Sequence, residues 1–169
     1  MIKEGTARIF GDNINGDTAC QFSPETKGKL DPEFLAPRCM MGYDPNFTQR
    51  AKAGDMIIAG KNFGSGHVHP EFYYSLTAFG IGAVIADSVS DIFLREAVNA
   101  GIPVLECEGI KSIIAEGDRV QIDLSSGIIK NLTNGKQLSG PPLPPELIEL
   151  ISAGGIIPYL KSQKKKGLL

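Results

Sequence analysis

Three short apolar runs, separated by two segments of helix length, most constrain what this chain can fold into. Their apolar centres are continuous rather than alternating, which is typical of strands that are buried on both faces of a sheet. Strand, helix, strand, helix, strand at this spacing predicts parallel strands joined by right-handed crossovers. The runs lie at 55–60, 83–86 and 103–107.

Proline, serine and glycine mark the ends of the two intervening helices. The first is expected over 70–79, because a proline suits the first helical turn and Gly80 would stop the helix. Ser88 and Asp91 resemble a capping box and predict the start of the second helix. Gly101 predicts its end.

The N-terminal part of the chain is rich in turns. A strand is expected over 5–11, followed by a long stretch, 12–46, punctuated by Asn-Gly, Ser-Pro, Lys-Gly and Asp-Pro pairs. Only one short helix is expected there, over 32–36. Long loops inside compact domains are usually functional, so this stretch is predicted to act partly as a lid or a specificity loop.

The last third of the chain changes character. Alternating segments at 118–124 and 128–132 around a Ser-Ser-Gly turn predict an antiparallel ribbon. A helix is expected over 146–153 and a short element over 159–161. The basic tail, 161–169, is expected to be flexible.

Composition narrows the class of protein. With 169 residues, 42% hydrophobic side chains and neither an internal repeat nor a linker, residues 1–169 are expected to form a single α/β domain. A net charge of −2 supplies no basic field for nucleic acid. The apolar runs are too short for a membrane span and no hydrophobic signal core is present, so a cytoplasmic location is expected.

The three cysteines are widely spaced and form neither a disulfide framework nor a Cys-x-x-Cys motif. They are expected to be reduced thiols that pack as small hydrophobes. If an iron–sulfur cluster matters to this protein, another chain is expected to carry it. The cysteines are Cys20, Cys39 and Cys107.

Both histidines of the chain lie in a glycine-rich turn between the first buried strand and the first helix. Free N–H groups at a helix start can bind a carboxylate or a phosphate, and glycines allow a close approach of the backbone. A neutral imidazole there is a competent general base. His67 and His69 are therefore the candidate catalytic residues.

Two other interpretations of the histidines remain. One histidine can cap the turn while the other packs against the sheet. Alternatively, His67, His69 and Glu71 can bind a divalent ion if the loop is extended. Pro70 argues against this metal site, since a helix that begins inside the triplet turns alternate residues to different faces.

Five segments of the chain resemble the aconitase family, most of all the free-standing small subunit of 3-isopropylmalate dehydratase and homoaconitase. Together they span nearly the whole chain, and the central block is specific. The segments are Arg8–Asp12, Asp44–Phe47, Ala59–Gly66, Gly80–Pro103 and Ala153–Leu160.

The resemblance implies the swivelling β/β/α domain of the aconitase C-terminal type and a hydro-lyase of amino-acid biosynthesis, such as leucine biosynthesis. It implies a heterodimer with a large aconitase-type subunit that carries a [4Fe–4S] cluster, and no cofactor in this chain. The substrate would be a small 2-hydroxy di- or tricarboxylic acid. A homo-oligomer of the isolated subunit is a further expectation.

The site motif departs from the family pattern. The family typically has Asn-Phe-Gly-Cys-Gly-Ser-Ser-Arg-Glu, in which the first serine is the base and the arginine binds a substrate carboxylate. Here Ser65 stands at the cysteine, His67 at the base serine, Val68 at the second serine, His69 at the arginine and Pro70 at the glutamate. The early Asp-Thr-Asp motif is replaced by Asn-Gly-Asp over 15–17, and the loop that follows matches poorly.

Three hypotheses follow. In the first, the chain is an active dehydratase subunit in which His67 removes the proton and a protonated His69 binds a carboxylate, while the partner's cluster acts as a Lewis acid on the substrate. In the second, it is a non-catalytic or divergent anion-binding subunit. In the third, it is an independent metal enzyme. The residues expected to bind substrate are Asn62, Gly64, Ser65 and Gly66.

Overall fold

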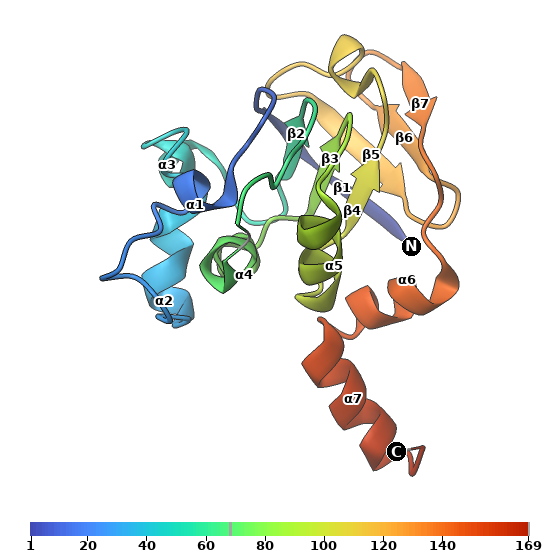
Figure 1. Ribbon diagram of the computed structural model, residues 1–169. Coiled ribbons are helices and arrows are strands. Elements are labelled where there is room, and N and C mark those ends of the chain that lie inside the picture. The colour runs from blue at the N-terminus through green and yellow to red at the C-terminus, as the bar shows by residue number, and fades with distance from the viewer. Residues whose placement is uncertain (68, 169) are drawn as a thin grey trace.

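The computed structural model describes residues 1–67 and 69–168, with a seven-stranded sheet in the order β4-β3-β2-β1-β5-β6-β7 (Figure 1). The strands are β1 (Ile2–Ile9), β2 (Met56–Ala59), β3 (Ala83–Ala86), β4 (Val104–Glu106), β5 (Arg119–Asp123), β6 (Ile128–Asn131) and β7 (Gln137–Ser139). The α-helices are α1 (Gly16–Ala19), α2 (Pro32–Leu35), α3 (Phe47–Arg50), α4 (Pro70–Phe79), α5 (Asp91–Asn99), α6 (Pro145–Ser152) and α7 (Ile156–Lys165), with two 3-10 turns, η1 (Ala36–Arg38) and η2 (Ile110–Ser112).

The central strand and helix pattern is confirmed. Strands β2, β3 and β4 pair in parallel, and α4 and α5 connect them. Helix α4 covers the predicted residues because Pro70 opens its first turn and Gly80, with a φ of 89°, accepts the left-handed conformation that ends it.

The predicted cap of α5 is wrong by two residues. The side chain of Ser90, not that of Ser88, accepts the backbone N–H of Phe93. The hydroxyl of Ser88 instead accepts the backbone N–H of Asn62 in the loop after β2. Asp91 follows Ser88 by three residues and Ser90 by one, so the capping-box spacing alone favoured the wrong serine.

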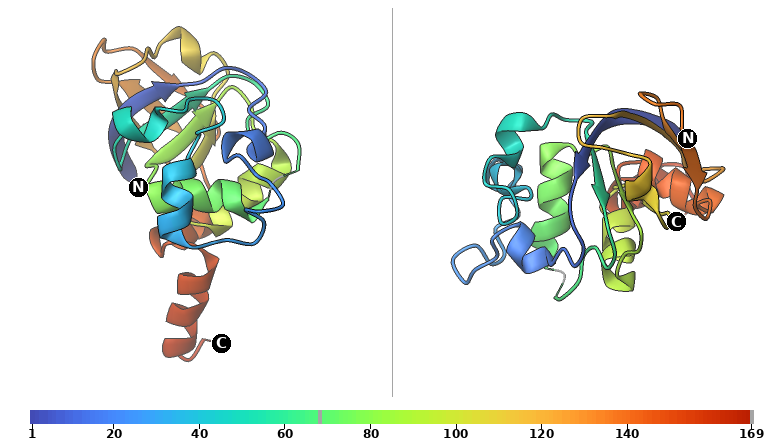
Figure 2. Two further views of the ribbon diagram at one scale, coloured as in Figure 1. Left: turned by 90° about the vertical axis from the view of Figure 1, so that its left-hand side faces the viewer. Right: turned by 90° about the horizontal axis from the view of Figure 1, so that it is seen from above.

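Strand β1 joins the two halves of the sheet. Ala7–Ile9 pairs in parallel with β2, whereas Ile2–Thr6 pairs antiparallel with β5. The strand therefore starts and ends earlier than the predicted 5–11. Its first residues become part of the strand because they pair with β5, which lies far along the chain. The sheet curls around this shared strand (Figure 2).

Alternate residues of the parallel strands face two different cores. Ile57, Ala59 and Val84 belong to the core that also contains residues of α4 and α5. Met56 and Ile58 belong to the second core, which the curled strands β5 and β6 and the turn η2 complete. Both faces of β2 and β3 are buried, as their continuous apolar sequences predicted.

The turn-rich stretch over 12–46 is more structured than expected. Helix α2 confirms the predicted short helix, whereas α1 was not predicted, and neither was α3, which follows that stretch directly. The segments α1, α2, η1 and α3 gather beside α4 (Figure 1). The functional loop expected from this stretch is thus a folded layer that packs against the first crossover helix.

The C-terminal third contains the predicted ribbon, which β7 extends by a further antiparallel strand. Helix α6 matches the predicted 146–153 to within a residue at each end. Helix α7 is longer than the predicted 159–161 and extends away from the sheet (Figure 2). It includes residues 161–165 of the tail that was expected to be flexible, while Leu169 lies outside the described residues.

Across the described residues, none of the helices has both the length and the apolar character that a membrane crossing requires.

Candidate active site

The predicted site lies where the chain leaves the carboxyl end of β2 and enters α4. Two loops meet there, since β1 and β2 are parallel neighbours and end at the same edge of the sheet. The backbone N–H groups of Gly64 and Ser65 both donate to the carbonyl of Ile14, at 2.8 and 3.0 Å. The N–H of Gly16 donates to the carbonyl of Ser65. The loop after β1 thus holds the glycine-rich loop in place.

The four residues expected to bind substrate mainly organise this loop. Asn62 has a φ of 60°, and its amide Nδ2 donates to the side chain of Asn13 at 3.0 Å. The carbonyl of Gly64 accepts the Ser90 hydroxyl at 2.6 Å. Gly66 has a φ of 81°, and a Cβ there would overlap the side chain of Asn15. Asn62 and Gly66 are exposed, whereas Gly64 is buried.

Ser65 faces the scaffold rather than open solvent. Its hydroxyl lies 3.4 Å from the carbonyl of Ile14, and its backbone forms a parallel bridge with Asn15. The hydroxyl at the family's cysteine position is therefore directed toward the loop after β1.

The two histidines lie together at the open edge of the loop. His67 is exposed, and its ring centroid lies 6.3 Å from that of His69. His69 is the N-cap residue of α4, yet its side chain makes no capping hydrogen bond. The interpretation that one histidine caps the helix with its side chain is therefore wrong for His69. Val68, placed by the resemblance at the second serine, lies outside the described residues.

Two residues that the sequence did not identify surround His69. The ring of Phe22 stacks on the imidazole, with centroids 3.8 Å apart and planes 6° from parallel. On the edge of the ring, Nε2 lies 3.7 Å from Oδ1 of Asp17, the acid of the Asn-Gly-Asp segment. That segment was noted only as a departure from the family motif, and nothing local links either residue to His69.

Glu71 turns away from the histidines. It is buried, and its carboxylate accepts the backbone N–H of Gly28 from the folded layer. Its charge and that of Asp17 add to the effect of burial, which raises the pKa of the nearby Cys20 thiol to about 11. Within residues 1–67 and 69–168, no group of three or more histidine, cysteine or acidic residues can hold a metal ion. The metal site of His67, His69 and Glu71 is therefore not formed.

The N-terminus of α4 has fewer free backbone N–H donors than a helix start ordinarily provides. Pro70 has no N–H, and the N–H of Phe72 donates to the carbonyl of His69 at 3.0 Å. A carboxylate bound at this edge would consequently depend on a charged imidazole more than on the backbone.

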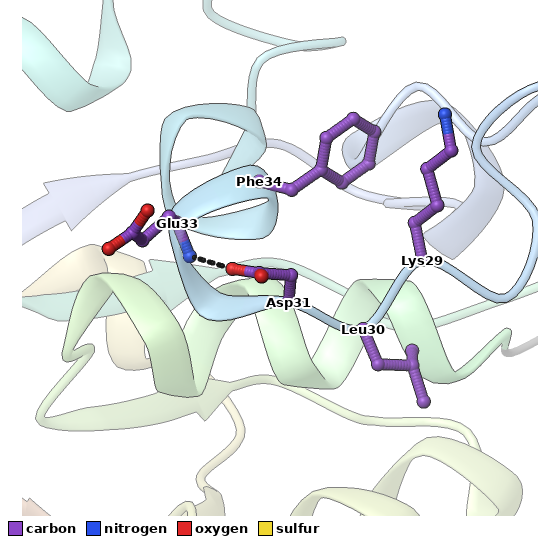
Figure 3. A pocket seen from close by; sticks show the side chains of 5 residues that line it. All are labelled: Lys29, Leu30, Asp31, Glu33 and Phe34. Carbon is purple, nitrogen blue, oxygen red and sulfur yellow. Dashed lines mark hydrogen bonds between the residues drawn. The ribbon is translucent and has the colours of Figure 1, made fainter.

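A separate open depression lies on the folded layer (Figure 3). It is lined by Lys29, Leu30, Asp31, Glu33 and Phe34, and Asp31 caps α2 through the backbone N–H of Glu33. None of the predicted site residues lines it.

The comparisons with known proteins decide the family. A model of the aconitase C-terminal domain matches residues 40–109. The small subunit of isopropylmalate/citramalate isomerase from Methanocaldococcus jannaschii is 42% identical over 164 residues, which cover 96% of this chain and 95% of that protein. The 3-isopropylmalate dehydratase small subunit of Ruminiclostridium cellulolyticum is 41% identical, covering 96% of this chain and 98% of its own. The chain belongs to the 3-isopropylmalate dehydratase small-subunit family.

Further relatives support the same assignment for this small subunit. The 2,3-dimethylmalate dehydratase small subunit of Eubacterium barkeri is 36% identical over 165 residues, covering 98% of this chain and all of that one. The crystal structure of 3-isopropylmalate dehydratase from M. jannaschii superimposes with a TM-score of 0.88 at 35% identity, over 99% of this chain and 98% of that chain. The fold is therefore of the aconitase C-terminal type, and the chain is a small subunit of the aconitase-type hydro-lyases.

Proposed function

We propose that this small subunit pairs with a large aconitase-type subunit in the cytoplasm to dehydrate or isomerise a 2-hydroxy dicarboxylic acid. In this proposal His67 is the general base and His69 binds a substrate carboxylate. The observation that carries the proposal is the pair of imidazoles, 6.3 Å apart at the open edge of the loop that the family resemblance assigns to the substrate.

His67 suits the role of base because its ring is exposed and free to meet a substrate brought by the partner. An imidazole is the side chain best suited to exchange protons around neutral pH. It would take the proton from the carbon next to a substrate carboxylate. The released electron pair then forms the carbon–carbon double bond as the hydroxyl on the neighbouring carbon, which gains a proton from solvent, leaves as water, while His67 keeps the abstracted proton.

His69 suits the carboxylate-binding role because it lies beside His67, at the start of α4, and is one-third exposed. A charged imidazole donates one hydrogen bond from each ring nitrogen, in different directions, and so lacks the two-pronged grip of arginine. A substrate whose binding depends less on a tightly held carboxylate therefore fits this arrangement better. A small alkyl-substituted malate is such a substrate, whereas a tricarboxylate is not.

A [4Fe–4S] cluster does not fit the residues described here. All three cysteines are buried, Cys20 and Cys39 in one core and Cys107 in the other, and the described residues include no group of three or more histidine, cysteine or acidic residues that could bind a metal. In the proposed assembly the large subunit carries the cluster, and the roles assigned above are those of this chain alone.

The test is co-expression with the large subunit, anaerobic purification, and assay with 3-isopropylmalate, citramalate and 2,3-dimethylmalate, the compounds for which the relatives are named. His67→Ala is expected to lower kcat by roughly 10²–10⁴, the usual cost of losing a general base. His69→Ala is expected mainly to raise KM, since the contact serves the ground and transition states alike.

Ser65→Ala is the matched control in the same loop. If it abolishes turnover while His67→Ala leaves kcat nearly unchanged, the base is Ser65. If the assembled complex binds these acids without converting them, the chain is a non-catalytic subunit and the proposed function is wrong.

A further inference from the structure

His69 has a defined environment on two sides. Phe22 covers one face of the ring, and the Nε2 edge points toward Asp17 at 3.7 Å. The ring nitrogen that remains for a ligand is therefore Nδ1. The elements around the ring carry these titratable groups: Asp17 of α1, Cys20 at the C-cap of α1, Glu71, Tyr73 and Tyr74 of α4, and His67 in the loop.

The carboxylate of Asp17 is incompletely satisfied. Its Oδ1 is buried and has no hydrogen-bond partner among the described residues. The same holds for Oε2 of Glu71, at the start of the same helix. Buried carboxylate oxygens without partners are costly unless a positive charge lies close by. The ring of His69 is the group within ion-pair distance of Asp17 that can carry this charge.

The position of Asp17 is fixed by the scaffold that holds the site loop. Asn15 caps α1 by accepting the backbone N–H groups of Asp17 and Thr18, at 2.9 and 3.2 Å. The backbone of Asn15 forms the bridge with Ser65. Asp17 and the histidine loop are thus parts of one hydrogen-bonded unit.

The number of protons on the ring decides what His69 can bind. A neutral imidazole has a single N–H. If that N–H points at Asp17, Nδ1 presents a lone pair, which repels a carboxylate. If both nitrogens are protonated, Nε2–H faces Asp17 while Nδ1–H faces the ligand.

We propose that Asp17 is a positioning residue that orients the ring of His69, with Nε2 toward Asp17, so that in the imidazolium form Nδ1–H faces a substrate carboxylate. Together they replace the arginine of the family motif with a histidine–aspartate pair. This inference rests on the proposed function, because it presumes that His69 contacts the substrate.

The experiment compares Asp17→Asn, Asp17→Glu, His69→Gln and the Asp17→Asn/His69→Gln double variant in the two-subunit enzyme. Asp17→Asn is expected to raise KM about tenfold, the effect of losing one charge-assisted contact, with kcat within about twofold. Asp17→Glu should restore most of the affinity because it keeps the charge. In the double variant, KM should equal that of His69→Gln alone.

Glu33→Gln is the matched control, since it removes one exposed negative charge from the same N-terminal layer without touching His69. It is expected to leave KM unchanged. If Asp17→Asn leaves KM unchanged, lowers kcat instead, or multiplies the effect of His69→Gln, the pairing is overturned. If His69→Gln itself leaves KM unchanged, the proposed role of His69 fails instead.

The pairing is also measurable in the full chain without its partner. The chain has only two histidines, so two sets of imidazole ¹⁵N signals are expected. Asp17→Asn should move the ring signals of His69 and leave those of His67 in place. Equal movement of both sets, or of neither, overturns the pairing whether or not the assembled enzyme is active.

Discussion

The side chain of Ser90 links the site loop to the start of α5 through two hydrogen bonds, and removing it should lower the stability of the fold. The hydroxyl oxygen accepts the backbone N–H of Phe93 at 3.2 Å, and the hydroxyl donates to the carbonyl of Gly64 at 2.6 Å. Losing a serine N-cap costs about 1 kcal/mol. Leaving the buried Gly64 carbonyl without its donor costs about 1–2 kcal/mol more. We expect Ser90→Ala to lower the free energy of unfolding by about 2–3 kcal/mol.

Ser88 provides the matched comparison because it is the cap that the sequence predicted. Its hydroxyl accepts a single hydrogen bond, from the exposed backbone N–H of Asn62 at 2.9 Å. Ser88→Ala should therefore cost about 0.5–1 kcal/mol. Ser90→Thr keeps both hydrogen-bonding functions and should restore most of the lost stability.

Urea unfolding of the purified chain, followed by circular dichroism, measures all three variants. For a chain of this size, a loss of 2–3 kcal/mol corresponds to a fall in Tm of about 4–12 °C. A larger loss for Ser88→Ala than for Ser90→Ala would refute the assignment of the cap. Equal losses would show that the bond to Gly64 contributes nothing.

Three further predictions concern the loop, the thiols and one surface carboxylate. Gly64→Ala should cost about 2–5 kcal/mol in urea unfolding, because Gly64 has a φ of 74° and a Cβ would overlap Phe93; a loss below 1 kcal/mol would contradict this. Burial raises the pKa of all three cysteine thiols, those of Cys20, Cys39 and Cys107. A thiol reagent at pH 8 should therefore react slowly with each of them until the chain is unfolded, and a single thiol that reacts fast in the folded chain would contradict this. Hydrogen bonds, chiefly from Ser125, lower the pKa of Asp123 to about 2, so their stabilisation is complete above pH ~4 and lost as the pH falls toward 2. The stability gap between wild type and Asp123→Asn should close over that interval, and a gap that stays constant would contradict the assignment.

The middle of the fold could be predicted because its signals are local. Pro70 and Gly80 set the ends of α4 through their own backbone preferences, and the apolar runs of β2 and β3 need burial on both faces. The errors occur where a distant partner decides. The start of β1 depends on pairing with β5, and the cap of α5 depends on which serine reaches Gly64.

In the candidate site, too, the features set by local sequence were predicted and those set by distant contacts were not. The sequence located the histidine loop because glycines, a proline and the family resemblance coincide there. It did not find Phe22 or Asp17, since their contacts with His69 arise only when the layer containing α1 folds against α4. Glu71 shows the converse error: its spacing suggested a metal ligand, but the Gly28 N–H of that layer binds its carboxylate.

The way the loop is held explains how its chemistry can depart from the family while the fold does not. Backbone atoms form its main links to the rest of the molecule, from Gly64 and Ser65 to Ile14 and from Gly16 to Ser65. These bonds do not involve the side chains at 67 and 69. His67 is exposed and His69 is one-third exposed, so neither is needed to fill the core. Serine and arginine can thus give way to two histidines at little cost in stability, provided that a new charge partner arises. In our proposal Asp17 is that partner, and the backbone bond from Gly16 of α1 to Ser65 holds α1 against the loop.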